Sequence, residues 1–397
     1  MNSTPRMTPG ELRAAVSLAA IFGLRLFGMF VILPVFAVWA SARPGWTLSL
    51  VGIAMGAYGF TQGILQIPFG WLSDRHGRKR LLYVGLALFS AGSFACALAD
   101  SPWTLIAGRV LQGAGAVSGV AIAMAADLTR ESQRTKAMAI IGSTIGLAFA
   151  VSFVSAPYLE HRIGVPGIFA MTGVLALAAL AVVRWIVPDA PAGVHVPDSA
   201  AFWKALRDPE LIRLNVGIFT LHAVLMAMFI VVPFALVRGG LPSSEHWWVY
   251  LSSVGAGIVL VLPVLISRAS AHERRVFLVS VATIGVSLAV LALTLERLGG
   301  VIAALVIFFA GFNVLEAKLP ALVSRAAPRE ATGAATGVYS SVQFLGTFFG
   351  AAAGGALAQH AGFGAVPVAC LVAVVAWLAV AWNMGNFVPA ASPASRT

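Results

Sequence analysis

Glu316 is the residue of this sequence best placed to exchange a proton, because it is the only carboxylate well inside a long apolar segment. Asn313, Glu316 and Pro320 follow the i, i+3, i+7 spacing of one helical face. A carboxylate kept away from water binds a proton more readily than one in water. We therefore predict a proton-coupling role for Glu316. The alternative is a structural hydrogen bond or an ion pair with Lys318, although side chains two residues apart diverge on a helix.

Two arginines also lie inside apolar segments. Burying an arginine at membrane depth costs at least ~2.5–3.5 kcal/mol, so Arg25 and Arg109 must face the protein interior and have hydrogen-bond partners. Arg25 is either a counter-charge for Glu316 or a donor to backbone carbonyl groups, and we favour the second. Together with Glu316, the two arginines form the proton-coupling set that the sequence predicts.

Several uncharged residues of the apolar segments are candidates for a substrate cavity. Gln62 and Gln66 share a helical face and either line a cavity or bond to another helix. His222 can titrate near neutral pH, or it packs as a neutral side chain. Methionine adapts its shape to apolar ligands, although such residues more often fill a core. The predicted cavity residues are Met29, Gln62, Gln66, His222, Met226 and Asn313.

The sequence contains no arrangement of residues that indicates an enzyme. It has no Ser/His/Asp, His-Glu-x-x-His or paired-carboxylate pattern, so no catalytic residues are predicted. It also lacks the Gly-x-x-x-x-Gly-Lys-[Ser/Thr] loop that binds ATP. Cys96 and Cys370 both lie in apolar segments, which indicates neither a disulfide framework nor a metal site. We expect no cofactor and no metal ion.

The composition places these residues in a lipid bilayer. Of the 397 residues, 59% are hydrophobic and 10% are charged, and the mean hydropathy is +0.90, whereas soluble domains are about 25% charged. A bilayer requires each backbone polar group to be paired within the chain, which predicts an all-α membrane protein. Runs of about 20 apolar residues span a bilayer. Twelve transmembrane helices are predicted, at 14–39, 48–72, 81–99, 102–126, 137–159, 166–187, 211–237, 246–267, 276–295, 300–323, 333–357 and 364–387.

The 26 lysines and arginines give the chain a net charge of +11. Such a charge can indicate nucleic-acid binding, but here the basic residues lie in short loops between apolar runs, so no nucleic-acid partner is expected. If the N-terminus lies inside the cell, most lysines and arginines fall on the cytoplasmic side. Four fall on the outer side, namely Arg43, Arg162, Arg238 and Arg297, and Arg25 and Arg109 lie within helices. Since basic loops stay on the cytoplasmic side, both termini are predicted to be cytoplasmic.

A polar stretch divides the predicted helices into two sets of six. The predicted regions are an N-terminal bundle (1–187), a cytoplasmic linker (188–210), a C-terminal bundle (211–388) and a disordered tail (389–397). The run 29–34, Met-Phe-Val-Ile-Leu-Pro, matches 228–233, Met-Phe-Ile-Val-Val-Pro. Duplicated bundles with a binding site between them are typical of alternating-access transporters. The sequence therefore predicts two pseudo-symmetric six-helix bundles.

The loop between the second and third predicted helices combines two glycines with an acid and a base. Gly70 lets a neighbouring helix approach closely, and Gly77 permits a turn with positive φ. Asp74 and Arg78 are four residues apart and can pair across that turn. The alternative is a solvated basic loop that only sets topology. The loop reads Gly70-Trp71-Leu72-Ser73-Asp74-Arg75-His76-Gly77-Arg78-Lys79-Arg80.

This loop resembles the signature of the major facilitator superfamily, Gly-x-Leu-x-Asp-Arg-x-Gly-Arg-Lys. The fourth predicted helix resembles the second signature of the superfamily, Arg-x-x-Gln-Gly-x-Gly-Ala, at Arg109, Gln112, Gly113, Gly115 and Ala116. The chain also resembles the bacterial YajR subgroup along nearly its whole length. Segments that carry this likeness include 127–131 (Asp-Leu-Thr-Arg-Glu), 134–139 (Arg-Thr-Lys-Ala-Met-Ala) and 315–317 (Leu-Glu-Ala). The resemblance implies a C-terminal soluble domain after the last helix, and we expect this chain to lack it, because the sequence ends in a short Pro/Ala/Ser-rich tail.

The resemblance implies the major facilitator fold and a monomeric, multi-pass protein of the bacterial inner membrane. It also implies proton-driven efflux of small amphipathic compounds or drugs, and it brings Asp127 near Arg78. The fifth helix departs from the antiporter signature, because Leu147 stands where a proline is expected, so the direction of transport stays open. The alternatives are a proton-coupled sugar or metabolite transporter and a membrane receptor that transports nothing.

These features together predict a conformational latch on the cytoplasmic side. Its residues are Gly70, Asp74, Gly77, Arg78 and Asp127. Asp74 would face the start of the eleventh helix, near residues 330–333, because the N-terminus of a helix attracts an acid. The latch would favour the outward-open state. The expected partners are a small-molecule substrate, protons and the lipid bilayer.

Overall fold

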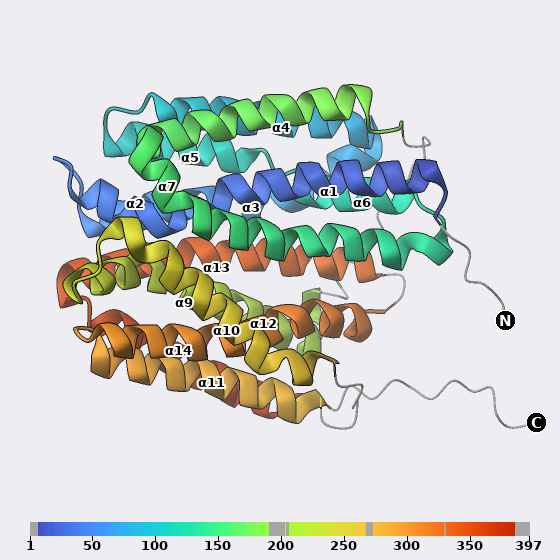
Figure 1. Ribbon diagram of the computed structural model, residues 1–397. Helices are drawn as coiled ribbons and strands as arrows, with labels where there is room; N and C mark the ends of the chain where they lie inside the picture. The colour runs from blue at the N-terminus through green and yellow to red at the C-terminus, as the bar shows by residue number, and fades with distance from the viewer. Residues whose placement is uncertain (1–6, 190–202, 204–205, 267–272, 329–330, 386–397) are drawn as a thin grey trace, which may run out of the picture.

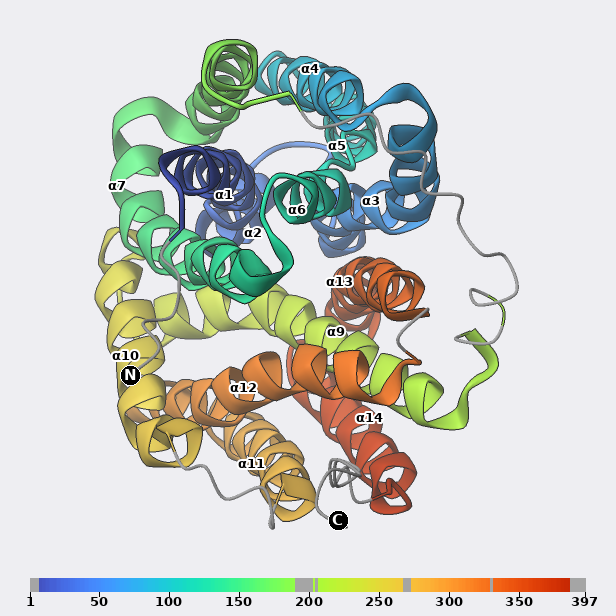
Figure 2. The ribbon, with the colours of Figure 1, turned by 90° about the vertical axis from the view of Figure 1, so that its right-hand side faces the viewer.

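The computed structural model describes residues 7–189, 203, 206–266, 273–328 and 331–385, in which every regular element is a helix. Figure 2 shows α1–α7 in one half of the molecule and α9–α14 in the other. The N-terminal half contains α1 (Pro9–Phe30), α2 (Leu33–Ser41), α3 (Leu48–His76), α4 (Arg78–Ala97), α5 (Pro102–Ala114), α6 (Ser118–Asp127) and α7 (Glu131–Trp185). The C-terminal half contains α9 (Pro209–Arg238), the short helix η1 (Ser243–Glu245), α10 (His246–Ile266), α11 (Glu273–Thr294), α12 (Leu298–Ala326), α13 (Thr332–Ala361) and α14 (Ala365–Trp382). The predicted tail 389–397 and most of the predicted linker 188–210 lie outside the described residues.

In the described part of the chain, 11 stretches are long and apolar enough to cross a membrane. α1 and α2 together form one of them, and so do α5 and α6. Polar side chains set where these stretches begin: Thr8, Thr47 and Ser101 each accept a hydrogen bond from a backbone N–H of the first helical turn. The prediction of an all-α membrane protein is confirmed, whereas the number of twelve helices stays a prediction.

The helix α7 is too long to be a single membrane pass. Its 55 residues would extend about 80 Å at 1.5 Å per residue, more than twice the ~30 Å hydrocarbon core of a bilayer. At Gly164 the backbone leaves the helical conformation, with φ 67° and ψ 172°. The ribbon turns back at this point (Figure 1). α7 encloses the predicted helices 137–159 and 166–187, so this break accounts for the difference between 11 stretches and twelve predicted helices.

We call the side of the molecule on which α1 begins the terminal face. α7 begins there too, since Glu11 in the first turn of α1 bonds Arg130 at the start of α7. In the other half, α11 begins and α14 ends together, where Arg274 donates to the backbone carbonyl of Trp382. These helix ends lie on the same side of the molecule (Figure 1).

One seam between the two halves consists of α3 packed against α13. The glycines of α3 in this glycine seam are Gly52, Gly56, Gly59 and Gly63. Without side chains they let the two backbones approach closely. A Cβ added to Gly56 would lie 2.8 Å from Cα of Phe348, and one added to Gly63 would lie 2.9 Å from the carbonyl oxygen of Ser341. The two helices therefore run antiparallel, and α13 begins at the terminal face.

A second seam is aromatic and lies between α7 and the C-terminal half. The ring of Phe153 lies 5.2 Å from that of Phe229 in α9 and 5.3 Å from that of Tyr250 in α10. One turn earlier in α7, Phe149 lies 6.0 Å from Phe309 in α12. Ring pairs at these separations add to the burial of their apolar area. The aromatic seam therefore joins α7 to three helices of the other half.

Close contact between the halves is found away from the terminal face. At the far end of the glycine seam, the N–H of Leu48 donates to the side chain of Gln359 at 2.9 Å. Nearer the terminal face, Gly70 of α3, Gly142 of α7 and Gly337 of α13 have no heavy atom within 4 Å of an added Cβ. The close helix contact predicted at Gly70 is thus not made in this structure. It stays a prediction for a state in which the terminal side closes.

Candidate proton and substrate site

Three helices of the C-terminal half meet around Glu316. The carboxylate lies on α12, His222 on α9 and Gln343 on α13. The Nε2 atoms of Gln343 and His222 are 2.8 Å apart, and Gln343 Nε2 lies 3.4 Å from Glu316 Oε1. His222 Nε2 lies 3.8 Å from Glu316 Oε2. The Glu316 side chain is 27% exposed and that of His222 is 10% exposed, while Glu316 Oε2 itself is buried without a hydrogen-bond partner among the described residues.

Gln343 was missed by the sequence analysis. It is a polar residue inside an apolar segment, which is the same signal that selected Gln62 and Gln66. The structure joins two predicted residues of different roles, since Glu316 was assigned to proton coupling and His222 to the cavity. Lys318, the other partner considered for Glu316, instead lies 3.8 Å from Glu273.

The remaining predicted cavity residues have different surroundings. Asn313 is half-buried, and its Nδ2 has no hydrogen-bond partner among the described residues. Met29 is half-buried beside a cluster that includes Phe344 of the other half. Met226 is 5% exposed and belongs to the hydrophobic core. Asn313 and Met29 therefore stay candidates for contact with a substrate, whereas Met226 packs in the interior.

The surroundings of Arg25 correct the sequence analysis. Its guanidinium donates to the side-chain oxygens of Ser118 on α6 and Gln62 on α3. Among the described residues, Arg25 forms no ion pair with Glu316. No backbone carbonyl of these residues accepts a hydrogen bond from the Arg25 guanidinium. In this structure, therefore, Arg25 makes neither of the two predicted contacts, and its place in proton coupling stays a prediction. A polar network inside one half replaces them, because interior side-chain oxygens satisfy the cation without crossing to the other half.

The two glutamines of α3 belong to the same network. Gln62 Nε2 donates to Gln66 Oε1 at 2.8 Å. Gln62 is fully buried and Gln66 is 6% exposed. Of the two alternatives for this pair, the bond to another helix is confirmed, since Gln62 holds Arg25 of α1. They do not line a cavity in this structure.

Arg109 faces the interior with hydrogen-bond partners, as predicted. It donates to Gln112 Oε1 at 2.5 Å and to the backbone carbonyls of Ala54 and Met55 at 3.3 and 3.4 Å. Gln112 continues the network to Ser93 Oγ on α4 at 2.8 Å. Arg109 thus ties α5 to α3 and α4. The predicted proton-coupling set is not brought together, because both arginines lie in the N-terminal half and Glu316 lies in the other.

The residues of the predicted latch meet at the terminal face. Arg78 forms an ion pair with Asp74, and its Nε lies 3.0 Å from Asp127 Oδ2. Its NH1 also donates to Ser73 Oγ at 2.7 Å. Gly77 has φ 94°, the positive value predicted for this turn. The cluster joins α3, α4 and α6 within one half, while its role as a latch stays a prediction.

At the terminal face, each half ties the ends of its own helices together, and the two halves do so with a similar order of contacts. Besides the Arg78–Asp127 pair, Lys79 donates to the carbonyl of Val187 at 3.0 Å and to Asp189 at 2.8 Å. The hydrogen bond from Lys79 lowers the pKa of the Asp189 carboxyl.

In the C-terminal half the corresponding residues are Glu273 and Arg274, the first two of α11. Glu273 pairs with Arg325 of α12 at 2.6 Å, and Arg274 donates to Trp382 at the end of α14. In both halves, the first residue of the third membrane-spanning stretch thus binds the fourth stretch. The second residue of the third stretch binds the end of the last stretch. In the ion pair between the third and fourth stretches, the third stretch supplies the base, Arg78, in the N-terminal half and the acid, Glu273, in the C-terminal half. This repeated arrangement is structural evidence for an internal duplication.

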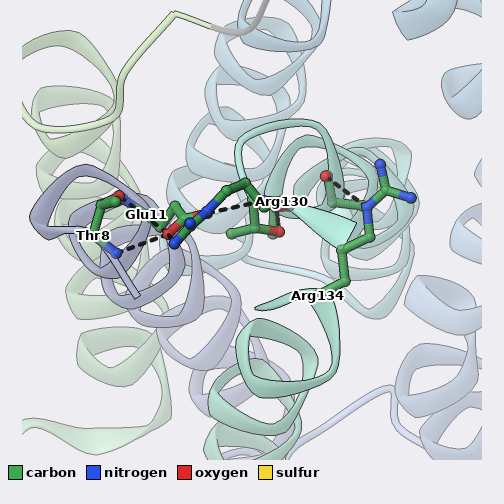
Figure 3. A network of polar contacts seen from close by, with 7 residues as sticks. Thr8, Glu11, Arg130 and Arg134 are labelled. Atoms are coloured by element: carbon green, nitrogen blue, oxygen red, sulfur yellow. Dashed lines mark hydrogen bonds and ion pairs between the residues drawn. The ribbon is translucent and has the colours of Figure 1, made fainter. Parts of the chain in front are cut away.

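A further polar network lies at the terminal face, between α1 and α7 (Figure 3). Arg130 binds Glu11 through Nε at 2.8 Å and through NH2 at 2.9 Å, while Thr8 N donates to Glu11 at 2.8 Å. Arg134 Nε donates to the carbonyl of Ala126 at 3.2 Å. An open hollow of about 400 Å³ beside this network is lined by Thr8, Glu11, Asp127, Leu128, Thr129 and Arg130. The sequence analysis did not predict Glu11 or Arg130 as site residues.

Comparison with known proteins agrees with this architecture. The Major Facilitator Superfamily profile matches residues 18–351. The chain belongs to this family and is a multi-pass membrane protein.

Among individual proteins, the chain is 41% identical to the inner membrane transport protein YajR of Escherichia coli K12, over 96% of this chain and 85% of that protein. It is 24% identical to the multidrug resistance protein MdtH of Aeromonas salmonicida, over 85% and 86% of the two chains. The fold is similar to that of a bacterial homologue of the lysosomal transporter Spinster in an inward-facing, occupied conformation. That comparison has a TM-score of 0.73 at 15% identity and covers 94% of this chain and 97% of the other.

Proposed function

We propose that this protein exports small amphipathic compounds across the bacterial inner membrane in exchange for protons, by alternating access. The observation that carries the proposal is the carboxylate of Glu316, on a partly exposed side chain between α9, α12 and α13. The likeness to an inner membrane transport protein and to multidrug resistance proteins supports it. A proton entering down ~150 mV releases about 3.5 kcal/mol, which sustains a substrate gradient of roughly several hundred-fold.

The first test concerns proton coupling. Ethidium is the probe, in everted membrane vesicles that carry a pH gradient. Addition of ethidium should release protons from vesicles with the parent protein, whereas Glu316→Gln should abolish gradient-driven transport and keep ethidium exchange. Concentrative transport by Glu316→Gln equal to the parent's would remove the proposed role. Proton movement in the opposite direction with a sugar as the probe would favour the alternative of a proton-coupled sugar transporter, and binding without turnover would favour a receptor.

The second test concerns topology. We propose twelve membrane passes with the terminal face in the cytoplasm, because most basic residues of the sequence lie in loops on that side. Alkaline phosphatase fused after Gly77 should be inactive, whereas a fusion near Asp100 should be active. The reverse pattern would contradict the orientation.

The third test concerns the latch. We propose that Asp74, Arg78 and Asp127 favour the state in which the terminal side is closed. Removing the charge with Asp74→Asn should weaken this state, and 1–3 kcal/mol shifts its population by about 5–150-fold. At equal membrane abundance, cysteine accessibility on the terminal side should rise and transport should fall. If both match the parent, the loop only sets topology.

A further inference from the structure

We propose that the transported proton is shared between Glu316 and His222, and that Gln343 transmits its arrival to α13. This inference rests on the proposed function and specifies how its proton site works. The three side chains come from three different helices, and each lies within 3.8 Å of the next. The inference assigns roles to His222 and Gln343 that a single titrating carboxylate does not need.

The hydrogen bonds define the state without the transported proton. His222 Nδ1 lies 3.3 Å from the carbonyl oxygen of Ile218, which can only accept, so the ring proton is on Nδ1. Nε2 of a neutral ring is then an acceptor, and it receives a hydrogen bond from the amide of Gln343 at 2.8 Å. The second amide hydrogen of Gln343 is directed to the ionised Glu316. The reverse orientation of this amide would place its oxygen against the carboxylate.

An arriving proton cannot leave this arrangement unchanged. If it adds to Glu316 Oε2, the nearest basic atom for the new O–H is His222 Nε2 at 3.8 Å, so the two side chains must move closer and the O–H must take the place of the Gln343 amide on Nε2. If it adds to His222, Nε2 becomes a donor toward Glu316. In both cases the amide of Gln343 loses its acceptor on His222 and must turn or withdraw. The proton comes from water on one side and returns to water on the other, and no bond between heavy atoms changes.

The position of Gln343 connects this event to the contact between the halves. Gln343 lies on α13, which forms the glycine seam with α3. Two residues earlier on the same helix, the carbonyl oxygen of Ser341 lies against Gly63. Release of the amide therefore removes one bond between α13 and α9, close to the place where α13 touches the other half.

Few other ionisable groups bear on this site. From α13, Tyr339 interacts electrostatically with Glu316, and from α9 His222 does so. On α12 itself, Lys318 lies near Glu273. Among the described residues, His222 is the one cationic group within ion-pair distance of Glu316. A pH-dependent change at this site is therefore assigned to the pair of His222 and Glu316.

The test needs no substrate. In protein whose Cys96 and Cys370 are replaced by alanine, a cysteine at Gly337 is alkylated with N-ethylmaleimide across neutral pH. This position is open in this structure and would be covered when the terminal side closes. A cysteine at Gly10, also open, corrects for the ionisation of the thiol itself. The measured quantity is the pH midpoint of the corrected alkylation rate.

The two variants should move this midpoint in opposite directions. Gln343→Met removes a donor that stabilises both unprotonated partners, so the midpoint should rise by about one pH unit, a tenfold change in proton affinity. His222→Phe removes the second acceptor of the shared proton, so the midpoint should fall by a similar amount. The matched control is His246→Phe, a buried histidine whose Nε2 lies 3.2 Å from the Leu241 carbonyl and whose ring packs against Tyr250, a contact that phenylalanine can keep. This variant should keep the parent's midpoint.

The outcomes separate this inference from the proposed function. A pH transition that persists in Glu316→Gln would remove Glu316 from proton coupling altogether. Loss of the transition in Glu316→Gln, with unchanged midpoints in Gln343→Met and His222→Phe, would overturn only the shared proton. Shifts of the two variants in the same direction would also overturn it. If Gln343→Met is not monodisperse, Gln343→Asn replaces it with the same expected sign, because its shorter amide cannot reach both partners.

Discussion

The glycine seam allows a prediction about the balance between two states. In Gly56→Ala the added Cβ would lie 2.8 Å from Cα and 2.9 Å from the carbonyl oxygen of Phe348. Both are backbone atoms, so no side chain can rotate away, and α3 and α13 must separate by about 1 Å to reach normal contact. Overpacking of this kind costs about 1–3 kcal/mol. The gain in helix propensity from alanine is present in both states and cancels.

This cost falls only on the state in which the seam is closed. The population with an open seam should therefore rise by about 5–150-fold. Thr347→Cys reports this opening, because Thr347 is 9% exposed and lies against Gly59 within the seam. Its alkylation should accelerate accordingly in protein without other cysteines.

The control for Gly56→Ala is a glycine with free space. Gly255 lies inside α10 and has no heavy atom within 4 Å of an added Cβ, so Gly255→Ala should leave the alkylation rate unchanged. Equal acceleration by the two variants would show that a general loss of stability, and not the seam, controls the labelling. No acceleration by Gly56→Ala would refute the seam as a gate.

Two further predictions concern the N-terminal half. Ser118→Ala leaves one nitrogen of the buried Arg25 without its acceptor, so it should destabilise the protein by about 1–3 kcal/mol, measured as thermal unfolding in detergent. Ser143→Ala should have little effect, because that exposed hydroxyl donates only to its own helix. Asp127→Asn should weaken the contact with the Nε of Arg78 and raise cysteine accessibility on the terminal side, and an unchanged accessibility would count against the latch.

Features set by a few neighbouring residues could be predicted from the sequence. The turn at Gly77 and the pairing of Asp74 with Arg78 depend on residues at most four apart, and the structure contains both. The apolar segments were also predictable, because the bilayer imposes their length. The break at Gly164 separates two such segments, although only one continuous helix is assigned across it.

Contacts between distant residues could not be predicted in this way. Gln343 is 121 positions from His222 and 27 from Glu316, and Arg25 is 93 positions from Ser118. Periodicity shows which face of a helix a residue occupies, but not which helix packs against that face. For this reason the sequence assigned Arg25 to the wrong partners and did not select Gln343.

The position of α13 explains how a change at one side chain can affect both halves. On one face, an added Cβ at Gly346 would lie 2.5 Å from the carbonyl oxygen of Phe219 in α9. On another face, the backbone of Phe348 lies against Gly56 in α3. Backbones in direct contact cannot absorb a displacement by rotating side chains, so α13 moves with one neighbour or separates from the other. Gln343 bonds α13 to α9, and its release therefore decides which of these two contacts holds the helix.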